Sequence, residues 1–562
     1  MKTHKSDNFF FRSLALGILS SLITALPLKA AERVFFSYGA VNVSISVVDL
    51  DTFAKKGIVS PELSLFLGKM TPQKQAELRE QLTKSYNINL TPLLRFFDTQ
   101  MGQDVLRGLG NFISLEGGEN GKDAVREALA KASSKPEGLT LLNILEQFPG
   151  NVQFNTDKIL SAGKLLNNTE KATKDIVKAM LDMSDKEISS ASAVDFSSMA
   201  DLRKPGPYGY EKQTITLTDK SRNRTFYVDI YQPKQWKTGK TPVVVASHGL
   251  ASNPEHFAGR GKHLASYGYV VAVPQHPGSD LIYAKNVLNG TTKEVFDINE
   301  FINRPRDISY VIDELQRRND SEFGGRLNLN SVGAIGHSFG GYTVLALAGA
   351  EIDFDYLQKQ CGVEFSRVNT SMLLQCRALN IPHRNYNFRD PRITAVIATN
   401  PVNSNIFGPK GLNKVSIPVM MGAGSYDPAA PVIFEQFRTF AWLNTPHKYL
   451  ALAEGQAHLD VSELNGPLGT MIKSSSDLTF PSPDLLNNYI NSMSLSFFDT
   501  YIGENERDRV YLQSAYANYL SQGEKFKLIL ITNSSISEVN NTIEEVRNKY
   551  FAEYINKGKD MK

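Results

Sequence analysis

The stretch SVGAIGHSFGGYTVLALAGA, residues 331–350, decides how the second half of this chain folds. Small and β-branched residues lead into Gly336-His337-Ser338-Phe339-Gly340, and an Ala- and Leu-rich segment typical of a helix follows. A serine between two such glycines, in a strand–turn–helix context, indicates a nucleophile elbow, in which the serine backbone is strained and its neighbours must be small. We therefore expect Ser338 Oγ to stand above the carboxyl end of a strand, with the amino end of the helix directed at the same place.

The sequence on both sides of this motif alternates between strands and helices. From residue 212, QTITLTD and RTFYVDIYQP predict an antiparallel hairpin, and further apolar runs each end in turn residues: PVVVASHG, YVVAVPQHPG, ITAVIATNP, IPVMMGAGSYD and KYLALAEGQAH. Helical patterns such as RPRDISYVIDELQRR separate most of these runs. This pattern is typical of the α/β class, with a mostly parallel sheet buried on both faces and ligands bound at the carboxyl ends of its strands.

A serine hydroxyl is a weak nucleophile unless a base accepts its proton, and the base must be oriented by an acid. In folds with this elbow the acid and then the histidine follow the serine along the chain. Three histidines follow Ser338. His383 comes before the next strand, and His447 lies at the amino end of the last strand. His458 follows KYLALAEGQA at the carboxyl end, so we predict that His458 is the base.

The acid is expected at the end of an intervening strand. Asp427 closes the run IPVMMGAGSYD and is the predicted acid. Asn400 ends the run ITAVIATN, but it has no charge with which to stabilise an imidazolium. Asp460, two residues beyond His458, remains as a local alternative with a poor position relative to the ring.

The oxyanion that forms during acyl transfer needs two preorganised donors. We predict that these are the backbone N–H groups of Phe339, directly after the nucleophile, and of Leu250, after the His248-Gly249 corner of VVVASHGLASNPEHF. For His248 a structural role in holding this loop by hydrogen bonds is favoured over a role as a metal ligand or as a second base. His276 and Asp280 supply only two ligand types without a third, so neither a metal nor a cofactor is predicted.

Residues 210–470 resemble α/β-hydrolases of the platelet-activating-factor acetylhydrolase and dienelactone hydrolase-like group. The resemblance rests on SHGLASNPEHF, VAVPQHPGSD, RPRDISYVIDEL and GHSFGGYT. The whole chain is similar to secreted cyanobacterial hydrolases with an N-terminal domain of unknown function, through FFSYGAVNVSISVVDLDTFAKKG, FFDTQMGQDVLRGLGNFISLEGGENGKDAVREAL and EGLTLLNILEQFP. It implies an α/β-hydrolase core and esterase or lipase-type chemistry, with Ser338, Asp427 and His458 matching the triad. Asn400 stands where acetylhydrolases of this group can carry their acid, so the resemblance does not extend to their substrate specificity.

The N-terminus predicts a secretory signal peptide over residues 1–30. Lys2, Lys5 and Arg12 precede the apolar run SLALGILSSLITALPL, and small residues follow near Ala30. The run is short for a membrane span, so an uncleaved anchor is the weaker alternative. We therefore expect a secreted or periplasmic protein.

The two cysteines, Cys361 and Cys376, lie fifteen positions apart. In an oxidising compartment such a pair predicts a disulfide, and two buried free thiols are the alternative.

The chain length of 562 residues requires several domains. After the signal segment we expect a mainly helical N-terminal domain over residues 31–205, with helices starting at Pro61 and Pro72 behind the capping residues Ser60 and Thr71. The α/β-hydrolase domain is expected over 206–475, with a lid insertion at 352–392. A C-terminal segment, 476–562, contains the helical SPDLLNNYINSMSLSFFDTYIG and the strand-like KFKLILI and is expected to pack on the core.

These features predict a secreted serine hydrolase that cleaves a small-molecule or lipid ester, with peripheral association with a membrane or the cell envelope. A peptidase or thioesterase using the same triad, and a non-catalytic envelope or binding protein on a degenerate hydrolase scaffold, are the alternatives. The net charge of +3 and the lack of a long basic run argue against a nucleic-acid partner. The sequence indicates no oligomeric state.

Overall fold

The computed structural model describes residues 30–39, 41–86, 89–362, 368–459 and 479–557. It divides into two compact units, one formed by residues up to 167 together with 285–295, and a larger one formed by 168–284 and 296–562. The predicted signal peptide lies outside the described residues except for Ala30. Among the described residues, no helix combines the length and the apolar character that crossing a membrane requires.

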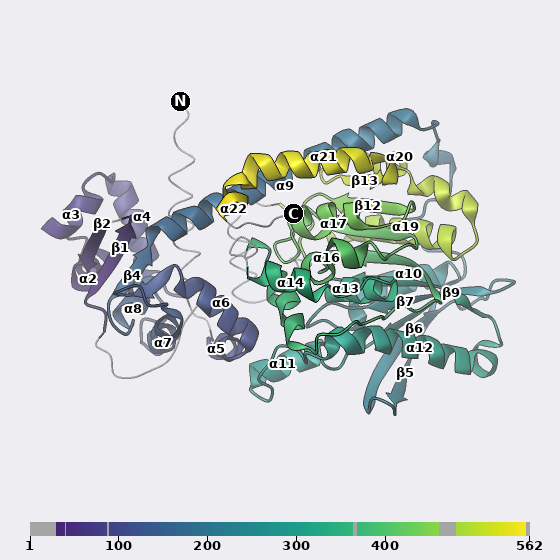
Figure 1. Cartoon of the computed structure of the whole chain (residues 1–562), viewed down its shortest axis with the longest axis horizontal. Coiled ribbons are helices and arrows are strands. Elements are labelled where there is room, and N and C mark those ends of the chain that lie inside the picture. The colour runs from purple at the N-terminus through teal and green to yellow at the C-terminus, as the bar shows by residue number, and fades with distance from the viewer. Residues whose placement is uncertain (1–29, 40, 87–88, 363–367, 460–478, 558–562) are drawn as a thin grey trace. The chain divides into compact units, whose positions relative to one another are not determined.

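The larger unit is built on one nine-stranded sheet in the order β13-β12-β11-β10-β9-β7-β8-β6-β5 (Figure 1). The six central strands β8, β7, β9, β10, β11 and β12 run parallel to one another, whereas β6 pairs antiparallel with β8 and β5 at one edge and β13 pairs antiparallel with β12 at the other. The predicted α/β class and the predicted hairpin are therefore confirmed. The strands are β5 Glu211–Asp219, β6 Arg224–Gln232, β7 Thr241–Ser247, β8 Val270–Pro274, β9 Leu327–His337, β10 Ile393–Thr399, β11 Val419–Gly424, β12 Lys448–Ala453 and β13 Leu528–Thr532.

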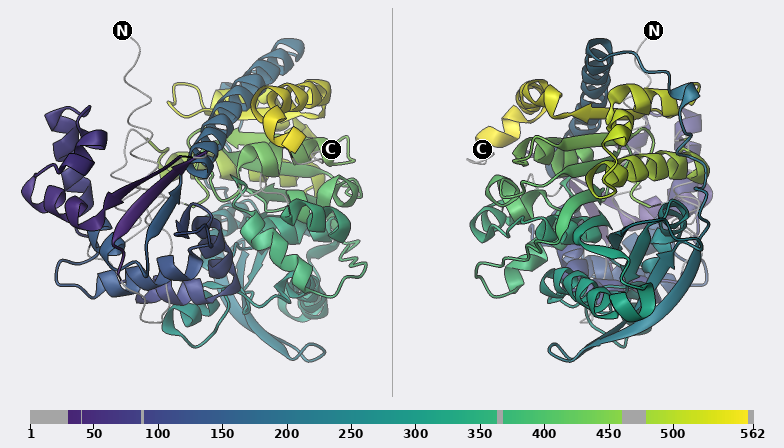
Figure 2. Two further views of the ribbon diagram at one scale, coloured as in Figure 1. Left: turned by 60° about the vertical axis from the view of Figure 1, so that its left-hand side comes forward. Right: turned by 90° about the vertical axis from the view of Figure 1, so that its right-hand side faces the viewer.

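Helices cover both faces of this sheet (Figure 2). On one face, α10 (Ala258–Ser266) and α19 (Pro483–Tyr501) pack against alternate residues of the central strands in one continuous core. Four other helices contact the sheet or each other beside it: α12 Glu300–Phe323, α13 Phe339–Leu347, α16 Ser404–Leu412 and α17 Arg438–Trp442. Burial on both faces explains why the central strands are apolar at nearly every position.

The insertion at 352–392 contains α14 (Phe354–Cys361) and α15 (Met372–Gln375), and the Cys361–Cys376 disulfide is present within it. The buried Glu435 carboxylate fixes this insertion to the core. It accepts hydrogen bonds from Asn369 and Ser371 of the insertion and from the backbone N–H groups that begin α16. A buried carboxylate with this many donors is well compensated.

Helix α9 (Thr156–Ser190) explains why the larger unit begins at residue 168 and not near 205, where the Pro- and Gly-rich sequence had placed the boundary. The second half of α9 is bonded to the C-terminal segment. Asp175 accepts a hydrogen bond from Tyr550, and Glu187 accepts from Ser514 and from both the N–H and the hydroxyl of Thr532. These contacts join residues far apart in the sequence, which a local change of composition cannot reveal.

The smaller unit contains a four-stranded sheet in the order β2-β1-β4-β3, which the sequence reading of a mainly helical domain did not include. Its strands are β1 Arg33–Tyr38, β2 Val41–Ser46, β3 Ile113–Leu115 and β4 Val152–Asn155, and its helices are α2 Val47–Lys56, α3 Pro61–Leu67, α4 Pro72–Thr83, α5 Thr91–Asp98, α6 Gln100–Gly110, α7 Lys122–Ser133 and α8 Leu141–Glu146. The predicted helix starts at Pro61 and Pro72 are confirmed, because Ser60 and Thr71 each accept a capping hydrogen bond. Segment 285–295, which includes the second half of α11 (Leu281–Asn289), belongs to this unit, and Arg95 donates to the Leu288 carbonyl within it.

Candidate active site

Ser338 stands at the junction of β9 and α13 with φ 57° and ψ −116°, a conformation that is uncommon for a residue other than glycine. Two flanking glycines make this turn sterically feasible. A Cβ on Gly336 would lie 2.0 Å from the Gly340 carbonyl oxygen, and one on Gly340 would lie 1.8 Å from the Ser247 carbonyl oxygen. Any larger residue at either position would force the backbone apart, so the motif and the turn require each other.

The structure brings Ser338, His458 and Asp427 together from three separate strand ends. Ser338 Oγ lies 2.8 Å from His458 Nε2, and His458 Nδ1 lies 2.7 Å from Asp427 Oδ2. The Asp427 side chain is fully buried, whereas the imidazole of His458 is 15% exposed. This is a hydrogen-bonded chain from hydroxyl to imidazole to carboxylate, the arrangement that raises the nucleophilicity of a serine.

Three donors besides His458 hold the Asp427 carboxylate. The N–H groups of Ala429 and Ala430 each donate to Oδ1 at 2.8 Å, and Asn400 Nδ2 donates to Oδ2 at 2.5 Å. Burial alone would raise the pKa of Asp427, but the hydrogen bond and charge of His458, together with the Asn400 and Ala430 donors, outweigh it and hold that pKa below its usual value. Asp427 is therefore an ionised acceptor. Asp460, the alternative acid, lies outside the described residues.

His337, the residue before Ser338, supports the predicted base His458 in a way that the motif alone does not indicate. Its Nε2 lies 3.1 Å from the backbone carbonyl oxygen of His458, to which it donates, and the two rings lie 4.9 Å apart. Burial lowers the pKa of His337 well below its usual value, and the neighbouring His458 adds to this, so His337 stays neutral. A neutral donor can hold the loop of His458 without adding a charge beside the base.

Gly249 runs directly beside the nucleophile, because a Cβ on it would lie 3.3 Å from Cβ of Ser338. The two predicted oxyanion donors therefore border the same space: Leu250 follows Gly249, and Phe339 begins α13. In the part of the chain that the structure describes, the N–H groups of Leu250 and Phe339 donate to no other residue. Both are available to a ligand at Ser338 Oγ, as a pair of oxyanion donors must be.

Beneath this loop lies a buried network of charged side chains. His276, Glu300 and Asp307 hold oxygen and nitrogen atoms within 4.8 Å of one another, the one grouping with metal-like spacing among the described residues. Guanidinium groups already occupy its acceptors: Arg224 binds both carboxylates and Arg222 binds Asp307. His276 Nδ1 donates to Asp307 and not to Asp280, the acidic residue nearest to it in the sequence. The grouping is an ion-pair network, and Asp280 instead accepts from Gln275.

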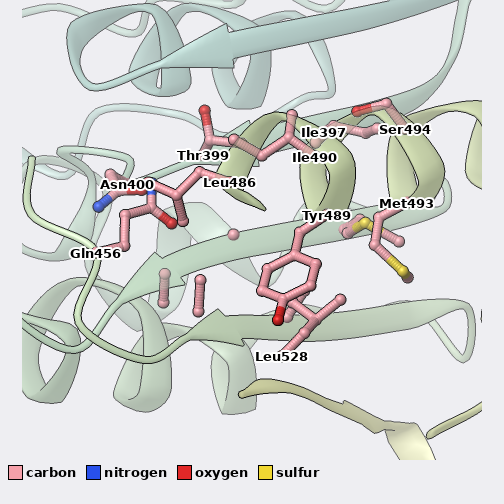
Figure 3. A pocket seen from close by; sticks show the side chains of 15 residues that line it. Ile397, Thr399, Asn400, Gln456, Leu486, Tyr489, Ile490, Met493, Ser494 and Leu528 are labelled. Carbon is pink, nitrogen blue, oxygen red and sulfur yellow. The ribbon is translucent and has the colours of Figure 1, made fainter. Parts of the chain in front are cut away.

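A small apolar cavity of about 40 Å³ lies between the ends of β10 to β12 and α19 (Figure 3). Asn400 and Gln456 lie at one end of it, and Met493 and Ser494 lie at the other. Its volume is enough for water-sized groups only. It places an apolar wall behind the Asn400–Asp427 hydrogen bond.

Comparison with known families gives two matches. Residues 30–155 match the family described as alpha/beta hydrolase of unknown function, and residues 211–294 match the family described as platelet-activating factor acetylhydrolase, isoform II. No curated protein matches the chain. The segment 30–155 thus resembles a family of unknown function and the segment 211–294 resembles an acetylhydrolase family, in agreement with the resemblances that the sequence motifs indicated.

Proposed function

We propose that this α/β-hydrolase is a secreted serine esterase that cleaves small acyl or lipid esters through a covalent acyl-enzyme. One observation carries the proposal: the hydrogen-bonded chain from Ser338 through His458 to the buried Asp427. The match of residues 211–294 to an acetylhydrolase family supports an ester as the substrate. The Cys361–Cys376 disulfide is a feature of proteins that mature in an oxidising compartment, which supports secretion.

In the proposed reaction, His458 Nε2 accepts the Ser338 proton while Oγ attacks the ester carbonyl carbon. The carbonyl oxygen becomes an oxyanion, which the N–H groups of Leu250 and Phe339 stabilise. The ionised Asp427 stabilises the imidazolium and keeps its Nδ1 proton in place. His458 then protonates the departing alkoxide, and the acyl group remains on Ser338. A water molecule, deprotonated by His458, attacks the acyl-enzyme carbonyl carbon. The bond from this carbon to Ser338 Oγ then breaks, the acid is released, and the His458 imidazolium returns its proton to Oγ.

A fluorophosphonate probe tests the nucleophile directly, because it phosphonylates activated serines. We expect a single labelled peptide that contains Ser338, and no labelling of Ser338→Ala. Turnover of a series of p-nitrophenyl esters from acetate to decanoate, an sn-2 acetyl phospholipid, an acyl thioester and a peptide amide then defines the substrate class. Faster cleavage of the thioester or the amide than of every ester would replace the esterase proposal with the corresponding alternative.

The secreted location has a separate test. Expression of the full chain in a Gram-negative host, followed by N-terminal sequencing of the exported protein, is expected to give a mature start near Ala31. Recovery of uncleaved protein from the cytoplasm would contradict it.

A further inference from the structure

Arg304 is a fully buried cation directly below the proposed oxyanion site. It lies in the first turns of α12, and none of its side chain is exposed. Burial lowers the pKa of Arg304 to about 10, so the guanidinium still carries its charge at neutral pH. A buried charge is unfavourable unless ion pairs and hydrogen bonds compensate for the loss of water around it. The contacts of Arg304 therefore indicate its role.

The first set of contacts fixes the loop after β7. Arg304 Nη2 donates to the His248 carbonyl oxygen at 2.6 Å and lies 3.4 Å from the Gly249 carbonyl oxygen. His248 Nδ1 donates to the same Gly249 carbonyl at 2.8 Å. In a trans peptide the carbonyl and the following N–H point in opposite directions. Holding the Gly249 carbonyl toward Arg304 and His248 therefore turns the Leu250 N–H away from them.

The second contact fixes the elbow. The guanidinium carbon of Arg304 lies 4.5 Å from the centroid of the Phe339 ring, a cation–π distance. Phe339 is fully buried and supplies the other proposed oxyanion donor. One guanidinium therefore touches both segments whose N–H groups must converge on the same oxygen.

The ion-pair network holds Arg304 itself. Arg304 Nε donates to Ser279 Oγ at 3.0 Å, and Ser279 Oγ donates to Glu300 Oε2 at 2.9 Å. Glu300 is in turn bound by Arg224. This chain of contacts fixes the orientation of the guanidinium plane. Without it, the arginine side chain would sample several rotamers and the orientation would vary.

We propose that Arg304 is a positioning residue of the oxyanion site, which aligns the Leu250 and Phe339 N–H groups by holding the Gly249 carbonyl and the Phe339 ring. This inference rests on the proposed esterase function. It predicts a defect in transition-state stabilisation with ground-state binding preserved, because Arg304 acts through the two donors and leaves the rest of the substrate site unchanged.

Steady-state kinetics on the best ester found for the wild type provide the first readout. Arg304→Met is expected to lower kcat about 100-fold, the loss typical of one oxyanion donor, with KM within about threefold of wild type. The kcat of Arg304→Lys should lie between those of the wild type and Arg304→Met, because lysine keeps the charge but lacks the planar guanidinium group. A folded Arg304→Met variant with wild-type kcat would overturn the proposal.

Inhibitor binding provides a second readout, which would not change selectively if the role of Arg304 were purely structural. A trifluoromethyl ketone adds to a serine and forms an oxyanion, whereas the matching secondary alcohol binds without reacting. Arg304→Met should lower the affinity for the ketone by about the same factor as it lowers kcat/KM, and it should leave the affinity for the alcohol unchanged. Equal weakening of both compounds would show a general packing defect and overturn the positioning role.

Arg222→Met is the matched control. Arg222 pairs with Asp219 and Asp307 in the same network, and no contact with residues 248–250 or 339 is found for it among the described residues. We expect a lower Tm with kcat within about threefold of wild type. A 100-fold loss of kcat in this control would assign the Arg304 effect to the network as a whole and overturn the proposal.

If Arg304→Met does not fold, the variant Ser279→Ala tests whether Arg304 positions the oxyanion donors. It removes the Nε acceptor of Arg304 but keeps the guanidinium, so kcat should fall by about tenfold, the value of a hydrogen bond to a charged group, with KM unchanged. Unchanged kcat would overturn the proposal. A wild-type chain that hydrolyses no ester and does not react with fluorophosphonate would instead overturn the proposed function, and the role of Arg304 with it.

Discussion

Asn400 donates from Nδ2 to Oδ2 of Asp427, the same oxygen that lies 2.7 Å from His458 Nδ1. Asn400 has φ 45°, a left-handed conformation that asparagine tolerates better than most residues, at the end of β10. The residue that follows β10 is therefore in direct contact with the acid that follows β11. This contact shapes the first two predictions.

Asp427→Asn should lower ester turnover by about 10⁴-fold, because an amide cannot hold the Nδ1 proton of His458 or stabilise the imidazolium. The fold should be unchanged, since the amide can still pack in the same space. Turnover of one simple ester and the far-UV circular dichroism spectrum check the two expectations. Asp460→Asn is the control and should lose far less activity; the opposite ranking would reassign the acid.

Asn400→Asp should restore part of the activity of Asp427→Asn. A carboxylate at position 400 would start 2.5 Å from the place now held by Asp427 Oδ2, within reach of His458. We expect a gain of about tenfold or more over the single variant, because even an imperfectly placed charge stabilises the imidazolium. Asn400→Ala in the same background should give no gain. A double variant no faster than Asp427→Asn would show that the end of β10 does not reach the base.

Removal of the disulfide should destabilise the larger unit. Replacement of both Cys361 and Cys376 by serine opens a loop with a sequence separation of 15, which is worth about 3 kcal/mol in the chain-entropy model. The urea midpoint should fall, and the wild type treated with a reductant should unfold at the same lower midpoint. An unchanged midpoint would mean that the bridge does not constrain the unfolded chain.

Asp499 should make stability depend on pH. It accepts a hydrogen bond from Tyr269 at 2.5 Å, and burial, reinforced by Asp508 and opposed by Lys237, raises the pKa of Asp499 to about 7. The unfolded value is about 4, so the folded state binds the extra proton between about pH 4 and 7. The stabilisation is full below about pH 4 and is lost as the pH rises through 7.

Asp499→Asn keeps an acceptor for Tyr269 and removes this titration. The difference in Tm between variant and wild type should therefore be more favourable to the variant at pH 8 than at pH 5. Thermal unfolding at the two pH values measures this difference directly. A difference that is the same at both would show that Asp499 does not titrate in this range.

The strands of the larger unit's sheet could be predicted because the sequence signals that mark them are local. Apolar runs that end in turn residues mark each strand, and the glycines around Ser338 are required by contacts within a few residues or with the adjacent strand. The sheet of the smaller unit is different: Val34 of β1 pairs with Val152 of β4, far away in the sequence, in segments that were read as part of a helical domain. Pairing over that distance leaves no local pattern.

The residues that hold the candidate site in place are harder to predict from the sequence than the residues expected to react. Arg304 lies in RPRDISYVIDEL, where charged residues at a helix start would ordinarily be solvent-exposed. Its partners come from the loops after β7 and β8 and from α13, so only the assembled fold brings them together. The sequence indicates Asn400 only as a weak rival acid, because its hydrogen bond to Asp427 depends on the register of β10 beside β11.

The antiparallel pairing of β12 with β13 has a consequence for biosynthesis. Every residue of the proposed triad has left the ribosome before β13 is made, yet β12, whose loop carries His458, is an open sheet edge until β13 covers it. A nascent chain arrested before residue 528 should therefore be inert toward fluorophosphonate, and reactivity should appear once residues 528–532 have emerged. The proposed triad would then be inactive during most of the chain's synthesis, and its activation would be timed by the growth of the polypeptide itself.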